Sequence, residues 1–286
     1  SRPKDPKVHA QNAATGEFEL SDVEFHEIRR VVHRTTGIAL ADTKRHLVYG
    51  RLARRLRALG MTSFRDYLQR IEDDAQELEE FCNAITTNLT FFFREGHHFQ
   101  YLNNTLLPLL QKRNAASRRI RIWSAGCSTG EEPYSIACCI QETLGALKDW
   151  DIKILATDLD SKVLAHGREG VYNADRFDKV EKARRDRWFS PVKGGAQLVA
   201  KDEIRRLISF RRLNLMEAWP FKGPFDAIFC RNVVIYFDKP TQRIVFERLS
   251  ELQKSGDHLF IGHSESLFNV CERYELIGQT TYRKLD

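Results

Sequence analysis

The chain has 286 residues, of which 42% are hydrophobic and 29% charged, a balance that excludes a disordered or fibrous protein and leaves mass for two modest domains. No stretch reaches the roughly 18 to 20 uncharged apolar residues of a membrane helix, so we expect a cytoplasmic protein without membrane insertion. Its six cysteines include no C-x-x-C pair, and no cysteines or histidines cluster at metal-ligand spacing, so we expect free thiols and no metal.

The first part of the chain, residues 19–90, is predicted to form a small helical domain. Ser21 and Glu24 have the spacing of a capping box, and apolar residues follow at helical period until Gly37. Further amphipathic helices are predicted to follow within the same domain. The polar residues 1–18 lack the apolar core of a signal peptide and predict a flexible tail.

One helix of this domain carries an unusual charge. Residues 43–60 hold six basic residues and no Asp or Glu, so their formal charge of +6 equals that of the whole chain. An apolar stripe through the segment predicts an amphipathic helix with a cationic outer side. A solvated helix face is the ordinary alternative, but the absence of acidic residues favours docking of an acidic partner, either nucleic acid or protein. The docking candidates are Arg51, Arg54 and Arg55.

After Pro108 the pattern changes to short β-branched runs that alternate with helical ones, which is typical of a parallel sheet covered by helices. We therefore predict an α/β domain over residues 91–286. Residues 173–206 are too long and too charged for a simple crossover, and we predict an inserted small β subdomain with a hairpin turning at Gly194 and Gly195. The expected strands are 120–124, 152–157, 208–213, 225–230 and 258–262, with an antiparallel pair within 274–285.

The first expected strand leads into a glycine turn. It ends in Ala125-Gly126-Cys127-Ser128-Thr129-Gly130-Glu131-Glu132-Pro133, and a helix follows; this order brings backbone amides close to an adenosine cofactor. Two glutamates would repel a pyrophosphate, and the Gly-Lys-Ser/Thr ending of a phosphate loop is missing. Asp158, which ends the second strand, can accept hydrogen bonds from ribose hydroxyls. Together, the glycine turn, the two glutamates and Asp158 fit S-adenosylmethionine, which is a cation without phosphate. The alternative is an ordinary strand-helix connection.

Six strings of residues closely resemble the CheR family of chemotaxis receptor methyltransferases, in the same order along the chain. The resemblance implies a Rossmann-like class I methyltransferase sheet with an N-terminal helical domain and an inserted small β subdomain. It also implies methyl transfer from S-adenosylmethionine to glutamate carboxylates of receptors, giving glutamate methyl esters and S-adenosylhomocysteine in chemotactic adaptation. The strings are 86–95, 123–125, 128–135, 225–233, 235–237 and 262–265.

The resemblance also assigns roles to single residues. In the family, the residues that match Arg94 and Tyr236 lie nearest the transferred methyl. Purely structural roles are the alternatives. Asn88 and Thr90 could cap a helix, and Arg94 and Glu95 could form a surface pair. Tyr236 could belong to the core. The residues implied to hold the cofactor are Asn88, Thr90, Arg94, Glu132, Asp158, Asn214, Leu215, Arg231 and Asn232.

Two further points concern partners and metals. His97 and His98 look like a metal or base pair, but adjacent side chains are expected to point apart and no third ligand is evident, which favours structural roles. The partners implied by the resemblance are the cytoplasmic methylation helices of receptors, with a receptor C-terminal peptide as an open partner of the inserted subdomain.

Two rival functions are weighed against this one. A nucleic-acid methyltransferase is disfavoured, because residues 232–236 lack the two prolines expected at the end of the fourth strand, and no aromatic residues are interleaved with basic ones. A cofactor-binding scaffold without activity is disfavoured by the presence of both Arg94 and Tyr236.

Overall fold

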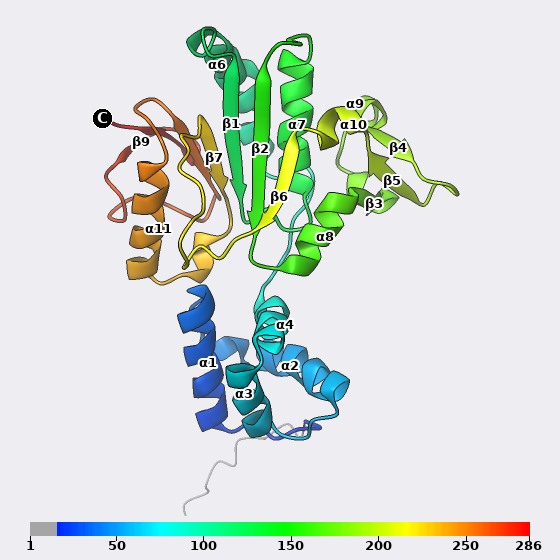
Figure 1. Cartoon of the computed structure of the whole chain (residues 1–286), viewed down its shortest axis with the longest axis vertical. Helices are drawn as coiled ribbons and strands as arrows, with labels where there is room; N and C mark the ends of the chain where they lie inside the picture. Colours follow the sequence, from blue (N-terminus) through cyan, green and yellow to red (C-terminus); the bar gives the residue numbers. More distant parts are fainter. Residues whose placement is uncertain (1–15) are drawn as a thin grey trace, which may run out of the picture.

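The computed structural model describes residues 16–286 and has a helical bundle below a larger α/β domain (Figure 1). The predicted tail, residues 1–18, lies mostly outside the described residues. Its last residue does not belong to a tail, because the Phe18 ring packs edge-on against Phe64 with ring centroids 6.4 Å apart and the Phe18 amide donates to the Tyr49 hydroxyl at 3.0 Å. The predicted end of the tail is therefore too late.

Four helices and one 3₁₀ turn form the helical bundle. The first helix starts with the predicted capping box, in which Ser21 and Glu24 bond each other's backbone amides, and ends at Gly37 in the left-handed conformation. In the basic helix, the stripe of Val48, Leu52 and Leu56 is fully buried. The bundle consists of α1 (Asp22–Thr36), η1 (Asp42–Lys44), α2 (Arg45–Leu59), α3 (Phe64–Asp73) and α4 (Ala75–Ile85).

A seven-stranded sheet is the centre of the second domain, in the order β6-β2-β1-β7-β8-β10-β9. The first five strands are parallel and the last two close the sheet as an antiparallel pair, so every predicted strand is confirmed within two residues or so at each end. The strands are β1 (Arg119–Ala125), β2 (Asp151–Asp158), β6 (Ile208–Arg212), β7 (Ala227–Cys230), β8 (His258–Ile261), β9 (Tyr274–Gly278) and β10 (Thr281–Lys284).

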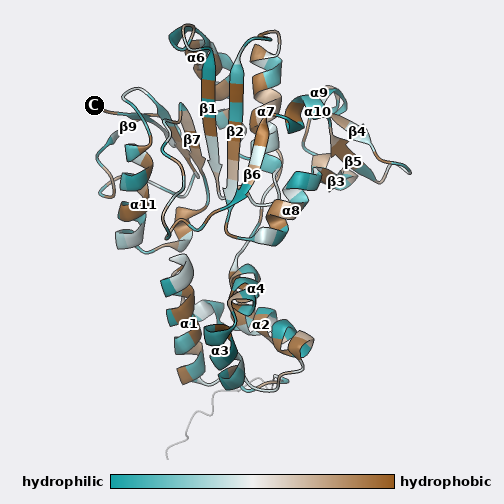
Figure 2. Ribbon diagram, in the orientation of Figure 1, coloured by the Kyte–Doolittle hydropathy of each residue, from teal (hydrophilic) through white to brown (hydrophobic). Residues whose placement is uncertain are grey.

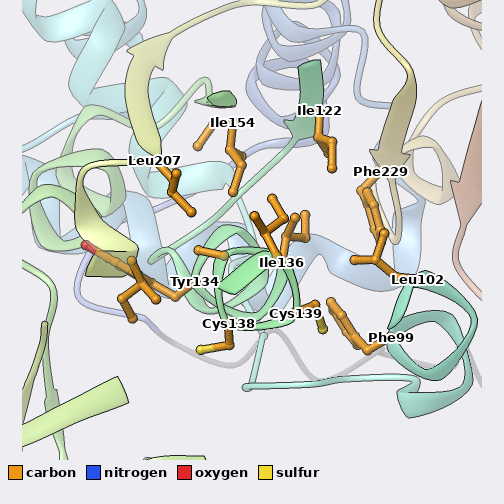
Figure 3. Close-up of a cluster of buried hydrophobic side chains, with 14 of the residues drawn as sticks. Phe99, Leu102, Ile122, Tyr134, Ile136, Cys138, Cys139, Ile154, Leu207 and Phe229 are labelled. Atoms are coloured by element: carbon orange, nitrogen blue, oxygen red, sulfur yellow. The ribbon is translucent and has the colours of Figure 1, made fainter. Parts of the chain in front are cut away.

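Helices cover both faces of this sheet, as the alternating pattern predicts. Alternate side chains of β1 enter different cores: Ile122 packs against α7 (Figure 3), whereas Trp123 belongs to the core on the α11 side. Figure 2 shows hydrophobic bands on the central strands and on the helices that cover them. The six cysteines are free and buried, as expected. The covering helices are α5 (Gly96–Tyr101), η2 (Leu102–Leu106), α6 (Leu107–Arg113), α7 (Glu131–Leu144), α8 (Ser161–Glu169) and α11 (Lys239–Glu251).

The inserted β subdomain is present as predicted. Its three strands pair antiparallel in the order β3-β5-β4, and the hairpin turns through Gly194 and Gly195, both with positive φ. The sheet begins at Val171, two residues before the predicted start, because β3 directly continues the crossover from α8. Its elements are β3 (Val171–Asn173), η3 (Ala174–Phe177), α9 (Lys182–Trp188), β4 (Phe189–Pro191), β5 (Gln197–Ala200) and α10 (Asp202–Arg205).

The linker between the two domains is anchored in this subdomain. Phe92, which is 3% exposed, stacks on Phe177 at 4.6 Å and meets Tyr172 and Phe189 edge-on. Arg176 donates to the carbonyl oxygen of Thr90 at 2.7 Å. The linker thus has a defined course past the sheet. None of the described helices combines the length and apolar character that crossing a bilayer requires.

Candidate active site

A cavity of about 560 Å³ lies between the helical bundle and the carboxyl ends of the parallel strands, the edge at which α/β sheets bind ligands. All of the predicted cofactor and catalytic residues contribute to its wall, and so does Arg51. Arg54 and Arg55 do not. The predicted residues that line it are Asn88, Thr90, Arg94, Glu132, Asp158, Asn214, Leu215, Arg231, Asn232 and Tyr236.

The glycine turn after β1 forms the floor of the cavity. Gly126 has φ +74°, and a Cβ atom on it would lie 2.4 Å from Cγ2 of Val233, so only glycine fits. The amides of Gly126 and Cys127 both donate to the carbonyl oxygen of Thr157 at 2.8 Å, which ties the turn to the end of β2. This close packing brings the ends of β1, β2 and β7 to one place.

Asp158, at the end of β2, is fixed by backbone amides. Its two carboxylate oxygens accept from Ser128 N at 2.8 Å and from Asp160 N at 3.0 Å. Burial raises the pKa of Asp158 to about 6, although those amides act in the opposite direction. The carboxylate retains lone pairs at the cavity wall, so it can accept hydroxyl donors from a ligand when it is ionised.

Asn88 is part of the site rather than a helix cap. The end of α4 is capped by Thr86, whose hydroxyl donates to the carbonyl oxygen of Asn83 at 3.0 Å. Asn88 instead donates to Oδ2 of Asp160 at 3.1 Å, and its carbonyl oxygen accepts from the Ser128 hydroxyl at 3.3 Å. The linker is therefore bonded to both the glycine turn and the loop after β2.

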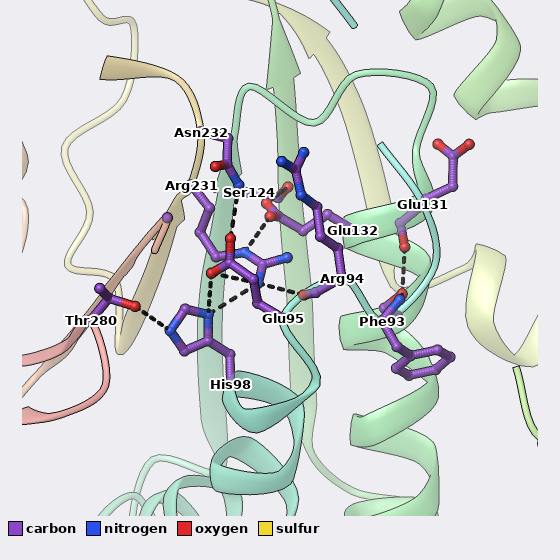
Figure 4. A network of polar contacts seen from close by, with 12 residues as sticks. Phe93, Arg94, Glu95, His98, Ser124, Glu131, Glu132, Arg231, Asn232 and Thr280 are labelled. Atoms are coloured by element: carbon purple, nitrogen blue, oxygen red, sulfur yellow. Dashed lines mark hydrogen bonds and ion pairs between the residues drawn. The ribbon is translucent and has the colours of Figure 1, made fainter. Parts of the chain in front are cut away.

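A buried arginine organises the next part of the wall (Figure 4). Arg231, whose side chain is 2% exposed, donates through Nε to Glu132 at 2.9 Å and through Nη1 to the Arg94 carbonyl oxygen at 2.7 Å. Glu132 also accepts from the Ser124 hydroxyl at 2.6 Å. Burial raises the pKa of Glu132 and the Arg231 charge opposes that rise. The pair neutralises itself and sets the backbone position of Arg94.

His98 is held neutral in the same network. Its Nδ1 lies 3.0 Å from Arg231 Nη1, and its Nε2 lies 3.0 Å from the hydroxyl of Thr280. Since Arg231 can only donate, Nδ1 accepts and the proton is on Nε2. Burial and the Arg231 charge lower the pKa of His98 to about 3. His98 therefore acts as a fixed acceptor for the guanidinium.

The expectation that His97 and His98 point apart, with no third ligand, is wrong. Their ring centroids are 4.2 Å apart, and together with Glu95 they offer metal-ligand atoms within 4.8 Å of one another. The backbone turn at Glu95, with φ +56°, brings the three together. However, Arg231 lies 3.9 Å from Glu95 Oε2, and its charge opposes a metal cation there.

Arg94 and Glu95 turn to different partners. Arg94 Nη1 donates to the carbonyl oxygen of Leu89 at 2.8 Å, whereas Glu95 Oε1 accepts from Asn232 Nδ2 at 3.2 Å and from the His263 amide at 3.3 Å. The surface pair considered as an alternative is thus not formed. Arg94 keeps its guanidinium at the cavity.

Tyr236 closes the opposite wall at the end of η4 (Val234–Tyr236), and its side chain is 37% exposed. The loop that carries it is held by Glu265, a buried carboxylate. Glu265 accepts from the amides of Asn232 at 2.6 Å, Gly262 at 2.7 Å and Ile235 at 3.1 Å. Sequence reasoning gave Glu265 no role, although it belongs to one of the recognised strings.

The predicted cationic face of the basic helix needs correction. Arg55 makes a bidentate ion pair with the buried Glu77 of α4, at 3.0 and 2.7 Å, and Arg51 donates to the carbonyl oxygen of Ile85 at 2.7 Å. Of the three docking candidates, Arg54 alone is exposed. The acidic partner comes from another helix, so the charge run by itself could not reveal the pairing.

The helical bundle also contributes residues that sequence reasoning missed. The segment between α1 and η1 lines the cavity with Ile38, Ala39 and Leu40. The Ala39 amide donates to the Tyr236 carbonyl oxygen at 2.8 Å, and Asn214 donates to the carbonyl oxygen of Thr35 at 2.6 Å. These short contacts join the bundle to the sheet. No sequence motif predicts them.

Two family models together match nearly the whole described chain. The model described as "CheR methyltransferase, all-alpha domain" matches residues 23–86, and "CheR methyltransferase, SAM binding domain" matches residues 88–283. The chain belongs to the CheR methyltransferase family. The resemblance, the fold class and the enzyme class predicted from the sequence are thereby confirmed.

Curated relatives in the family match over almost their full length. The "Probable chemotaxis protein methyltransferase" of Rhizobium etli is 45% identical over 258 residues, which cover 88% of this chain and 96% of the relative. "Chemotaxis protein methyltransferase 2" of Pseudomonas aeruginosa is 44% identical over 271 residues, covering 93% and 94%. The "Chemotaxis protein methyltransferase" of Escherichia coli is 42% identical over 275 residues, covering 94% and 93%.

As a CheR family member, the chain is an S-adenosylmethionine-dependent methyltransferase, and the cavity fits that cofactor. S-adenosylmethionine carries two ribose hydroxyls, a sulfonium and an ammonium group, but no phosphate. The wall offers the Asp158 carboxylate for hydroxyl donors, and it offers the side-chain amides of Asn88 and Asn232 for mixed polar contacts. Its one fully buried arginine is neutralised by Glu132.

Proposed function

We propose that this CheR family enzyme methylates glutamate side chains of chemotaxis receptors in the cytoplasm, giving glutamate methyl esters and S-adenosylhomocysteine. The observation that carries the proposal is that Asp158, Arg94 and Tyr236 line one cavity, where Tyr236 is also partly exposed to solvent. Such a wall can receive an acidic side chain that arrives from outside. The names of the curated relatives support chemotaxis as the process.

The chemistry requires positioning rather than acid-base catalysis. A glutamate is already ionised at neutral pH, its unperturbed pKa being about 4.3, so no general base is needed. The bound cofactor supplies an electrophilic methyl group on a positively charged sulphur. Alignment of two reactants is worth up to roughly 7–11 kcal/mol in well-oriented systems. Arg94 would position the acceptor carboxylate, and Tyr236 would border the reacting groups.

Substitution of these two residues tests the proposal. Arg94→Ala and Tyr236→Phe should lower kcat for transfer of a radiolabelled methyl group to receptor membranes, with the melting temperature unchanged. Each removes one polar group from the wall and leaves the buried network around Arg231 intact. Wild-type turnover in both variants would exclude them from the mechanism, and absence of receptor labelling by the wild type would refute the function.

The basic helix is proposed to dock the acidic methylation helices of receptors. Its exposed arginine is proposed to contact the receptor, whereas Arg55 stabilises the bundle. Arg54 is exposed and does not line the cavity, so Arg54→Glu should raise KM for receptor without changing cofactor affinity. Arg55→Glu should instead destabilise the bundle, because it places a second carboxylate beside Glu77. Unchanged receptor kinetics in Arg54→Glu would refute the docking role.

The β subdomain is proposed as the binding site of a receptor C-terminal peptide. Strands β3 and β4 each pair only with β5, so each leaves one edge for an added strand. Calorimetry with receptor tail peptides tests this proposal. Val199→Pro disrupts the central strand of the subdomain and should abolish peptide binding. If no tail peptide gives a binding heat, the subdomain is not a peptide-binding site. The proposal of methyl transfer to receptors would be unaffected.

A further inference from the structure

Three exposed apolar side chains gather at the entrance of the cavity. Leu47, Leu89 and Ile235, here called the apolar rim, are 44%, 73% and 42% exposed, and all three line the cavity. They come from α2, the interdomain linker and the loop after β7. Single exposed apolar residues are ordinary, but a group of them around one opening indicates a surface that a partner covers.

The apolar rim is built on fixed backbone. The Leu89 carbonyl oxygen accepts from Arg94 Nη1 at 2.8 Å, the Ile235 amide donates to the buried Glu265 at 3.1 Å, and Leu47 lies in the first turn of the regular helix α2. A partner would therefore not pay to order these segments when it binds.

Positively charged side chains lie next to the apolar rim. Lys44, Leu47, Arg51 and Arg54 follow one another at intervals of three, four and three residues; Lys44 is the last residue of η1 and the N-cap of α2, and the other three lie on one stripe of α2. The first three line the cavity, and Arg54 extends the stripe by one turn. The entrance therefore combines apolar contact area with positive charge.

From this arrangement we infer that the entrance selects acceptor glutamates by their neighbours in the substrate. The occupant is a helical segment that inserts one glutamate, places an apolar side chain one turn away against the apolar rim, and directs a second acidic residue toward Arg54. The inference rests on the proposed function and adds the recognition of the residues around the acceptor. Charge complementarity fixes the partner as acidic, and the apolar rim excludes a uniformly charged one.

A matched pair of double variants tests the inference in the full-length chain. Leu89→Gln with Ile235→Gln should raise KM for receptor about tenfold, because apolar area no longer leaves water on docking. KM for receptor is measured at saturating S-adenosylmethionine, so that a change in cofactor affinity does not affect it. The control is Leu276→Gln with Ile244→Gln, which alters the same residue types at 63% and 58% exposure on β9 and α11. It should leave KM at the wild-type value.

Two helical peptides separate this inference from the proposed function. Both contain one acceptor glutamate and a second acidic residue, and they differ only in leucine or glutamine one turn from the acceptor. The wild type should prefer the leucine peptide in kcat/KM, and the apolar rim variant should lose that preference. Equal use of both peptides by the wild type overturns the inference but keeps the function. No methylation of receptor or peptide by the wild type overturns the proposed function itself.

Discussion

Replacing Arg231 by methionine should destabilise the protein strongly and in a pH-dependent way. The guanidinium is 2% exposed and bonds Glu132, the Arg94 carbonyl oxygen and His98 Nδ1. Methionine fills similar space without charge, so Glu132 would be left buried with the Ser124 hydroxyl as its remaining partner. Breaking a buried pair in this way costs about 3–5 kcal/mol, a large part of the roughly 5–15 kcal/mol that stabilises a typical domain.

The sign of the pH dependence follows from Glu132. Burial already raises its pKa and Arg231 opposes the rise, so removal of Arg231 raises the pKa further. The folded variant then binds a proton more readily than the unfolded chain does. The penalty is therefore fully present above the folded pKa of Glu132 and shrinks as the pH falls through it.

Urea unfolding of four proteins measures this effect. The wild type, Arg231→Met, Glu132→Gln and the double variant should be compared at roughly pH 7.5 and roughly pH 5.5, and the loss caused by Arg231→Met should be smaller at the lower pH. Asp158 titrates in the same interval, so each variant is referred to the wild type at the same pH. The double variant should lose less than the sum of the single variants, because no buried charge is left unpaired.

Two results would contradict this reasoning. An equal loss for Arg231→Met at both pH values would mean that Glu132 does not change its protonation. Strict additivity in the double variant would mean that the pair at 2.9 Å contributes no coupling energy.

Three further outcomes follow from the structure. S-adenosylhomocysteine should bind more weakly as the pH falls through about 6, by about tenfold per unit well below it, because protonated Asp158 loses its charge; calorimetry should show this dependence abolished in Asp158→Asn. Glu265→Gln should lower kcat about ten- to hundredfold, because one amide oxygen cannot accept from three amides, while exposed Glu272→Gln should not. Phe92→Ala should cost about 3–5 kcal/mol in urea unfolding by removing the ring stacked on Phe177.

The positions of the elements could be predicted from local sequence because each depends on neighbours along the chain. The capping box at Ser21 and Glu24 starts α1, the alternation of short apolar runs defines the parallel strands, and paired glycines turn the β4–β5 hairpin. The glycine turn at Gly126 and the carboxylate of Asp158 follow consecutive parallel strands. Their meeting at one edge is a consequence of the fold class.

Only the tertiary structure decided which charged groups are available and which are already paired. Arg55 belongs to Glu77, Arg231 to Glu132, and the rings of His97 and His98 meet rather than diverge. The sequence by itself determined the two domains and the inserted subdomain, and it proposed many of the residues that the structure brings to the cavity wall, but not Ile38, Ala39 and Leu40. The partners of buried charges come from packing between segments distant along the chain, and no local pattern encodes that packing.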